Sequence, residues 1–260
     1  MPTRSAGTTE DDAASSSSAE RSLRLLALLA HEGRALSLAD LAARLQLPKG
    51  TAHRICAQLL AAGFLARDVD ERWFSVGPAL RRLALDTLNH GVERGLRHEV
   101  LAELVAKVGE TCNFTTLDGT SVLYLDRVEA EWPLRLTLDV GSHVPLHCTA
   151  SGKLFLAHMQ ADERDHVIAN LGLPGMTRNT ITTAAALHAE CAQIVKDGHS
   201  CDREEFIAGL IAVAVPVRDA RGTVRAALAV HAPVARMTLG DAVGQLSALR
   251  RAAHRLEGLL

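Results

Sequence analysis

Apolar positions recur with helical spacing through residues 38–63, and this stretch organises the rest of the chain. Its first half, LADLAARL, has apolar side chains three and four positions apart, which predicts a helix with one buried face and Ser37 as its N-cap. Pro48 disfavours helical geometry in the residue before it and suits the first turn of a new helix. We therefore predict a second helix after Pro48, whose apolar stripe consists of Ala52, Ile55, Cys56, Leu59 and Leu60.

The other face of this second helix carries short polar and basic side chains, namely Lys49, Thr51, His53, Arg54 and Gln58. Two short helices joined by a tight turn, with cationic and hydrogen-bonding groups early in the second, are typical of a helix-turn-helix that reads base edges in the major groove. An ordinary helical hairpin with a solvated face is the alternative for this stretch alone.

The segments on either side extend the pair into a winged helix-turn-helix. Residues 21–31 have a broad apolar face and predict a further helix. After Gly63, two β-prone runs on either side of a polar turn predict a hairpin, with Arg67 and Arg72 positioned to approach phosphates. Three helices followed by a hairpin favour a DNA-binding domain at residues 21–77. The preceding residues 1–20 are rich in Ser, Thr, Ala and acidic side chains, and we expect them to be disordered.

A helix that begins at Pro78 connects this module to the second half of the chain. Its apolar stripe consists of Leu80, Leu83, Ala84 and Leu88. The stripe has no obvious partner inside a small DNA-binding domain, so core packing and dimer packing are both open. We interpret residues 78–92 as a linker helix.

Residues 93–260 mix helical and strand patterns. A hairpin is predicted at residues 112–129 around Asp118-Gly119, a dipeptide typical of tight hairpin turns. Further strands are predicted at 135–140, 209–217 and 223–231, and helices at 93–108, 149–159, 162–171, 183–196 and 239–259. Antiparallel strands with helices on one face predict an α+β domain that could contain a small ligand.

Composition and charge add limits to this picture. The apolar share is 48% and the longest apolar runs are too short or too charged to cross a membrane, so we expect a cytoplasmic protein without a membrane partner. Residues 21–90 carry ten Lys or Arg against six Asp or Glu, a net charge of about +4 in a chain of net charge -2, which suits nucleic-acid binding by one part only. Five scattered cysteines without a CxxC motif indicate neither a disulfide framework nor a zinc knuckle.

Two further motifs carry a family resemblance. Together with the winged module, PLHCTASGKLFLA at residues 145–157 and CDREEFIAGLIAVAVPVRDARGTVRAALAVHAPVAR at 201–236 resemble the IclR family of bacterial transcriptional regulators. The resemblance covers nearly all of the chain after the N-terminal tail. It implies a winged helix-turn-helix, a linker helix and a GAF-like effector-binding domain. It also implies a homodimer or dimer of dimers on a palindromic double-stranded DNA operator, with a small metabolite as effector. We expect that metabolite to be a small organic acid.

Residue by residue, the resemblance places DNA reading on Lys49, Thr51, His53 and Arg54. It places the effector pocket on Leu146, Ala150, Ser151, Asp202, Ala212, Ala229 and His231. The N–H groups at the start of the helix from Thr149 would favour a carboxylate, and Gly152 would let a ligand or strand approach closely. Some relatives have Cys or Ser where this chain has Ala212, Ala229 and His231, so an acid larger or less polar than the shortest metabolites is possible, and His231 could pair with it.

Other chemistries are weaker interpretations of the same residues. Ser151 and Lys153 suggest a nucleophile and its base, but residues two apart on a helix point to different faces. Glu204-Glu205 could be an acid pair, although adjacent side chains diverge. A metal site could be imagined at His143, His147, Cys148, His199 and Cys201, without a recognised zinc spacing. We expect no catalytic residue, metal or cofactor.

Three classes of function therefore remain. A ligand-responsive, sequence-specific DNA-binding regulator is favoured. A small-molecule-binding enzyme with an accessory helical domain would need a convergent set of catalytic groups that the sequence does not show. A purely structural interaction protein would not need the basic recognition face.

Overall fold

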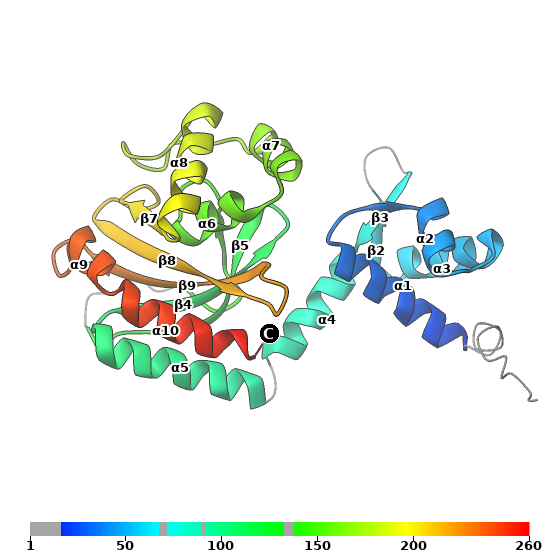
Figure 1. The fold of residues 1–260 in the computed structure, drawn as a ribbon, viewed down its shortest axis with the longest axis horizontal. Helices are drawn as coiled ribbons and strands as arrows, with labels where there is room; N and C mark the ends of the chain where they lie inside the picture. Colours follow the sequence, from blue (N-terminus) through cyan, green and yellow to red (C-terminus); the bar gives the residue numbers. More distant parts are fainter. Residues whose placement is uncertain (1–16, 68–71, 90–91, 133–137, 260) are drawn as a thin grey trace, which may run out of the picture. The chain divides into compact units, whose positions relative to one another are not determined.

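The structure is a computed structural model that describes residues 17–67, 72–89, 92–132 and 138–259. The chain divides into two compact units, Met1–Thr87 and Leu88–Leu260. Each unit has a hydrophobic core of its own, and Figure 1 shows the helices and strands of both.

In the described part of the first unit, helices surround a small antiparallel sheet with strand order β1-β3-β2. The elements are α1 (Ser18–Glu32), β1 (Leu36–Ser37), α2 (Leu38–Arg44), α3 (Lys49–Ala61), β2 (Leu65–Arg67), β3 (Trp73–Val76) and α4 (Pro78–Asn89). The predicted helix-turn-helix and its hairpin are both present. Strand β1 was not predicted, because two residues give no periodicity.

Local caps fix the helix ends of this unit. Ser37 accepts a hydrogen bond from the Asp40 N–H, and the Asp40 carboxylate accepts one from the Ser37 N–H, which confirms Ser37 as the N-cap of α2. The Ser17 hydroxyl accepts a hydrogen bond from the Glu20 N–H and so caps α1. Helix α1 therefore starts at Ser18, three residues before the predicted helix, and the prediction of disorder is wrong for residues 17–20. Residues 1–16 lie outside the described part.

The core of the first unit collects the apolar stripes of its elements. Leu25 from α1, Leu41 from α2, Ile55 from α3 and Phe74 from β3 are buried together. In α4, Leu80 packs against this core whereas Leu83 is 53% exposed. The stripe of α4 thus belongs only in part to the core of the unit.

The second unit is built on a curled antiparallel sheet with strand order β6-β5-β4-β9-β8-β7. Its strands are β4 (Thr111–Asp118), β5 (Ser121–Val128), β6 (His143–Pro145), β7 (Ser200–Arg203), β8 (Leu210–Arg218) and β9 (Val224–Pro233). Its helices are α5 (Val92–Val108), α6 (Ala150–His158), α7 (Ala161–Asn170), α8 (Ala184–Asp197), α9 (Leu239–Gly244) and α10 (Leu246–Glu257). The predicted α+β fold class is confirmed.

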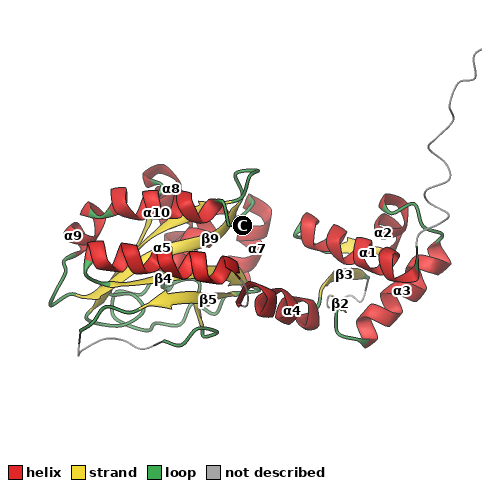
Figure 2. Ribbon diagram, turned by 90° about the horizontal axis from the view of Figure 1, so that it is seen from below, coloured by secondary structure: helices red, strands yellow, loops and turns green. Residues whose placement is uncertain are grey.

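The helices of this unit cover both faces of the sheet. Helices α5 and α10 lie side by side along one face (Figure 2), and α6 packs against the other face with α8 beside it (Figure 1). Prediction had placed helices on a single face. The near-continuous apolar runs of β8 and β9 reflect this arrangement, because both faces of these strands are covered and most residues of β9 are buried.

Three predicted details of the second unit need correction. Most of the strand predicted at 135–140 lies outside the described residues, and residues 138–140 are not in a strand. The closing helix is interrupted at Gln245, next to Gly244, because glycine is a poor helix former. The short strands β6 and β7 were not predicted. The predicted hairpin at 112–129 is confirmed, with Gly119 at the turn in a left-handed conformation of φ 60°.

Candidate functional site

Helix α3 presents a polar face on the first unit. Lys49, His53, Arg54 and Gln58 are exposed and Thr51 is half-buried, whereas Ala52, Ile55 and Cys56 of the same helix are buried in the core. The structure thus brings the predicted DNA-reading residues together on one surface. Pro48 provides no side-chain cap, which leaves the first N–H groups of α3 open to a phosphate.

The two arginines predicted to approach phosphates flank the turn between β2 and β3. Both Arg67 and Arg72 are exposed, and residues 68–71 between them lie outside the described part. The Arg67 guanidinium lies 5.3 Å from the centre of the Phe74 ring, the cross-strand neighbour of Arg67. This contact holds the stem of Arg67 against the sheet.

A small cavity lies between α6 and the sheet of the second unit. Its lining residues are Asn113, Tyr124, Leu138, Val144, Thr149, Ala150, Ser151, Asp202, Phe206, Leu210, Ala212, Ala229 and His231. The structure therefore brings six of the seven predicted pocket residues together. The exception is Leu146, which is fully buried in the core beside the cavity, so its prediction as an effector contact is not supported.

The cavity has about 30 Å³ of free volume for the centres of water-sized spheres. That volume holds two or three water molecules. The small side chains of Ala212 and Ala229 do not enlarge it, because the imidazole of His231 and the ring of Tyr124 also line it. The expectation of a larger acid stays a prediction.

Helix α6 begins at the wall of the cavity. The Thr149 hydroxyl donates to the Pro145 carbonyl at 2.7 Å and accepts from the Gly152 N–H at 3.1 Å. A Cβ atom on Gly152 would lie 2.3 Å from the Leu146 carbonyl oxygen. The glycine therefore serves the close approach of the preceding backbone, and not of a ligand or strand as predicted.

Residues from three strands determine which ring nitrogen of His231 carries the hydrogen and lower the pKa of the ring. One nitrogen of Arg127 in β5 lies 3.0 Å from Asn113 Oδ1 in β4 and 3.1 Å from His231 Nε2 in β9. Because a guanidinium only donates hydrogen bonds, Nε2 must accept and Nδ1 must carry the hydrogen. Burial and the Arg127 charge lower the pKa of His231 to about 3. His231 is thus a neutral donor and cannot act as a cationic partner for an acid at physiological pH.

Sequence reasoning missed Asn113 and Arg127, because their role depends on strand register. Asn113 pairs with Arg127 on one side and with Ala229 on the other. A polar pair within the predicted hairpin, at residues 113 and 127, was the available signal. Its link to His231 required knowing that β4 and β9 are neighbours.

Asp202 supplies a nearly buried carboxylate to the cavity, with 3% of its surface exposed. Its Oδ1 accepts from the Glu205 N–H at 2.7 Å and from the Phe206 N–H at 3.4 Å. Burial raises the pKa of Asp202 to about 7, and the negative charge of Glu205 adds to the effect while those N–H groups and Lys153 oppose it.

Replacing Asp202 with asparagine is therefore expected to stabilise the protein, more strongly at higher pH. The raised pKa means that the folded state of the parent protein holds the Asp202 proton more tightly than the unfolded state does. The stability that the parent gains from this proton is complete below about pH 4 and is lost as the pH rises through 7. Asparagine stays neutral, so its advantage over the parent should grow by up to about 3 kcal/mol between pH 5 and pH 8. Urea unfolding at both pH values measures it, with Asp162→Asn on the exposed start of α7 as control. A pH-independent difference would contradict the raised pKa.

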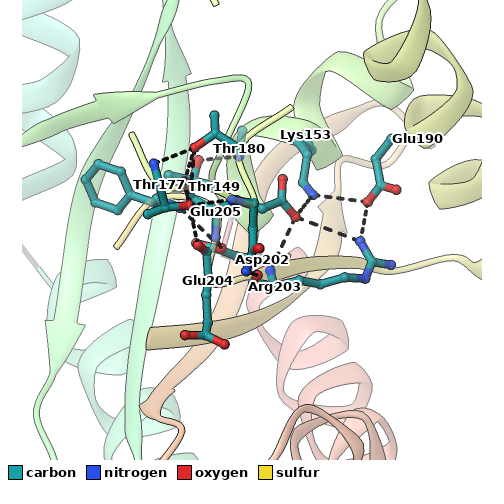
Figure 3. Close-up of polar contacts among 12 residues, drawn as sticks. Thr149, Lys153, Thr177, Thr180, Glu190, Asp202, Arg203, Glu204 and Glu205 are labelled. Atoms are coloured by element: carbon teal, nitrogen blue, oxygen red, sulfur yellow. Dashed lines mark hydrogen bonds and ion pairs between the residues drawn. The ribbon is translucent and has the colours of Figure 1, made fainter. Parts of the chain in front are cut away.

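A charged network lies behind the cavity (Figure 3). The Lys153 ammonium, which is fully buried, lies 2.5 Å from Glu205 Oε1 and 3.1 Å from Glu190 Oε1. Arg203 bonds the same Glu190 oxygen at 2.8 Å. Lys153 is thus held by two carboxylates and is not arranged as a base for Ser151.

The two adjacent acids diverge as the sequence indicated. Glu205 pairs with Lys153 (Figure 3), whereas the Glu204 carboxylate accepts from the Gly209 N–H at 2.8 Å. Thr177 and Thr180 tie this turn to the segment before α8 by donating to the Glu204 and Glu205 carbonyls. The turn that presents Asp202 is therefore fixed from both sides.

The imagined metal site does not assemble in the described residues. His143 bonds Asp118 and His147 bonds the Pro174 carbonyl, and the described chain contains no group of three potential metal ligands. All five cysteines are free and buried, and burial raises the pKa of the Cys56 thiol to about 11. Among the described helices, none combines the length and the apolar character needed to span a bilayer.

A helix-turn-helix unit joined to an α+β unit with a small-molecule cavity defines a transcriptional regulator with a DNA-binding domain and an effector domain. The model of the IclR helix-turn-helix domain matches residues 18–69, and that of the bacterial transcriptional regulator IclR C-terminal domain matches residues 93–257. The chain belongs to the IclR family of bacterial transcriptional regulators, as its motifs indicated.

Two relatives are similar to the chain over nearly its full length. The probable transcriptional regulator SauR of Cupriavidus necator is 43% identical over 242 residues, covering 93% of this chain and 96% of SauR. The HTH-type transcriptional repressor AllR of Escherichia coli K12 is 26% identical over 241 residues, covering 93% of this chain and 89% of AllR. These relatives are regulators and not enzymes, which agrees with the prediction that the chain is not an enzyme.

Solved structures give the same fold. The Thermotoga maritima IclR structure has a TM-score of 0.62 and 25% identity, covering 92% of this chain and 97% of its own. An IclR homologue from Microbacterium hydrocarbonoxydans, complexed with 4-hydroxybenzoate, has a TM-score of 0.58 and 27% identity, covering 94% of this chain and 99% of its own.

Proposed function

We propose that this protein is a sequence-specific regulator whose DNA binding responds to a small organic acid bound in the cavity beside α6. The observation that carries the proposal is the convergence of polar groups there. The start of α6, Ser151 and His231 offer hydrogen-bond donors in a cavity lined mostly by buried residues. The complex of a family member with 4-hydroxybenzoate supports an acid as the ligand.

We further propose that the protein acts in the cytoplasm as a homodimer or dimer of dimers on a palindromic operator. Residues 21–77 would form the DNA-binding domain, 78–92 the linker and 93–260 the effector domain. The exposed Leu83 in α4 supplies apolar surface for a second copy. An acid that binds one conformation of the dimer more tightly would shift the spacing of its two DNA-binding domains.

DNA selected by the protein from a random pool provides the test. Fluorescence anisotropy of the selected duplex, with and without added short organic acids, measures both binding and response. An acid should change the affinity for the selected duplex. If no acid changes the affinity and none raises the melting temperature, the proposed effector site is wrong.

Arg54 and Lys49 are expected to contribute differently to DNA binding. Arg54→Ala should weaken binding to the selected duplex by about 1–3 kcal/mol, because loss of a base contact is felt only on the specific sequence. Lys49→Ala should weaken binding to selected and random duplexes alike and lower the dependence on salt, as expected for a phosphate contact. Anisotropy titrations on both duplexes separate the two. Equal losses for Arg54→Ala on both duplexes would contradict a base-reading role.

A further inference from the structure

A second cavity lies on the other face of the sheet, next to helices α5 and α10, which run side by side there (Figure 2). Its lining residues are Arg97, Phe114, Thr116, Leu125, Arg225, Ala226, Leu256 and Leu259. Successive side chains of a strand point to opposite faces of its sheet. In β4, Asn113 accordingly lines the cavity beside α6 and Phe114 lines this one. We call the second space the apolar cavity.

The inner wall of the apolar cavity is mostly hydrocarbon. Its buried apolar residues are each at most 3% exposed, namely Phe114, Leu125, Ala226 and Leu256. Thr116, Arg225 and Leu259 are more exposed and lie toward its opening. The Thr116 hydroxyl is used by the fold, because it donates to the Arg225 carbonyl at 2.9 Å. A bound molecule would therefore be held mainly by apolar contacts.

Arg97 is the charged residue of the inner wall, and its charge is compensated. Its Nε lies 3.1 Å from Asp126 Oδ2, and both side chains are at least 95% buried. Asp126 Oδ1 also accepts from the Arg127 N–H at 2.8 Å and lies 3.1 Å from His98 Nδ1. An anion in the cavity would have to share Arg97 with the Asp126 carboxylate, which is unfavourable where water is scarce. The charges around the cavity thus favour an uncharged ligand.

The volume of the apolar cavity indicates the size of that ligand. On the same measure, it has about 170 Å³ and the cavity beside α6 has about 30 Å³. A protein cavity of about 150 Å³ lined by Leu, Ile and Phe binds one molecule of benzene. An empty space of this size leaves the lining atoms without dispersion contacts, so a ligand that fills it is favoured. A single six-membered ring with a small substituent fits these limits.

We propose that the apolar cavity is a second effector site, which takes an uncharged compound with one aromatic ring, such as a phenol or an alkylbenzene. The proposal goes beyond the acid effector and shares with it only the regulated binding of DNA. Helix α5 is the first helix that lies wholly in the second unit, and it contributes Arg97 to the cavity. The chain that comes from the DNA-binding unit therefore enters through the helix that the ligand contacts. A ligand that binds one position of α5 more tightly than another shifts the population toward that position.

Phenol and toluene test the site on the full chain at neutral pH, where both are uncharged. Isothermal titration calorimetry measures their binding to the parent, and both should bind. Benzoate, which has the same ring and a negative charge, serves as competitor. An excess of benzoate should change the affinity for phenol by less than about twofold, because an anion is not accepted by this apolar site. Fluorescence anisotropy of the selected duplex should show a changed DNA affinity at saturating phenol.

Ala226→Val locates the binding. It adds two methyl groups to the wall of the apolar cavity and should weaken phenol binding by at least about tenfold, since one extra methylene already matters in a filled apolar pocket. Ala229→Val is the matched control, because it makes the same change on the same strand at a residue that lines the cavity beside α6. It should bind phenol like the parent. Leu256→Ala enlarges the cavity and should admit 1-naphthol, which the parent should not bind; this variant keeps the test decisive if Ala226→Val does not fold.

Several results would overturn the proposal. These are a parent that binds neither phenol nor toluene, displacement of phenol by benzoate, equal losses in the two valine variants, and a DNA affinity that phenol leaves unchanged. Binding of phenol by a variant that lacks Leu260, but not by the parent, would also overturn it, because the end of the chain would then compete for the space. None of these results bears on the acid effector, which is tested separately with organic acids.

Discussion

Replacing Gly152 with alanine is expected to destabilise the second unit by about 3 kcal/mol or more. The added Cβ would lie 2.3 Å from the Leu146 carbonyl oxygen, 2.5 Å from Leu146 Cα and 2.6 Å from Thr149 Oγ1. Two of these atoms belong to the backbone, which cannot move without shifting the strand end before α6. The third is the hydroxyl that caps α6. The substitution thus disturbs both the core and the wall of the cavity.

Gly95→Ala is the matched control for this prediction. Gly95 lies inside helix α5 and is exposed, and a Cβ there would meet nothing within 4 Å. Alanine should stabilise that helix by about 0.5–1 kcal/mol, because it loses less backbone freedom than glycine. Urea unfolding followed by circular dichroism compares the two variants. Similar midpoints for both would show that the segment before α6 relaxes freely around position 152.

Replacing Lys153 with methionine is expected to cost about 3–5 kcal/mol of folding stability. Methionine fills a similar volume but removes the cation that lies 2.5 Å from Glu205, which is 2% exposed, and leaves only the Arg203 guanidinium at 3.9 Å. Glu205 Oε2 already has no hydrogen-bond partner among the described residues, so the carboxylate would become a nearly unpaired buried charge. Glu190 loses less, because Arg203 remains bonded to it.

Two further variants distinguish the contribution of the buried Lys153–Glu205 pair from that of the more exposed Arg203–Glu190 pair. Lys153→Met combined with Glu205→Gln should recover much of the lost stability, because the uncompensated charge is removed. Arg203→Met should cost less than about 1 kcal/mol, because that side chain is 49% exposed and its ion pair is screened by solvent. Chemical denaturation of the four proteins measures the differences. If the double variant were no more stable than Lys153→Met alone, the loss would stem from packing and not from charge.

Local sequence signals predicted the elements that local interactions determine. The cap at Ser37, the break at Pro48 and the turn at Asp118-Gly119 each act within a few residues, and all three have their expected roles. The cap at Ser17 also acts locally. It was missed because the polar composition of residues 1–20 led us to predict that the whole segment is disordered.

The cavity was predictable only where a family motif marked it. The structure brings Ala150, Ser151, Asp202, Ala212, Ala229 and His231 together around it, and their role in effector binding stays a prediction. Asn113 and Arg127 were missed because they meet His231 only after β5, β4 and β9 become neighbours, which is decided by contacts about a hundred residues apart. Leu146 does not line the cavity, because its side chain is buried in the core and its backbone lies against Gly152 of α6.

The five buried cysteines allow local opening of the structure to be measured by thiol labelling of the unmodified chain. Cys56 is in the core of the first unit, whereas Cys112, Cys148, Cys191 and Cys201 are buried in the second. A thiol reagent reacts with the exposed thiolate, so labelling of each site follows the rate at which its surroundings open. Peptide mapping after a timed pulse of such a reagent therefore measures the opening rates of the two units separately, both without DNA and with DNA bound.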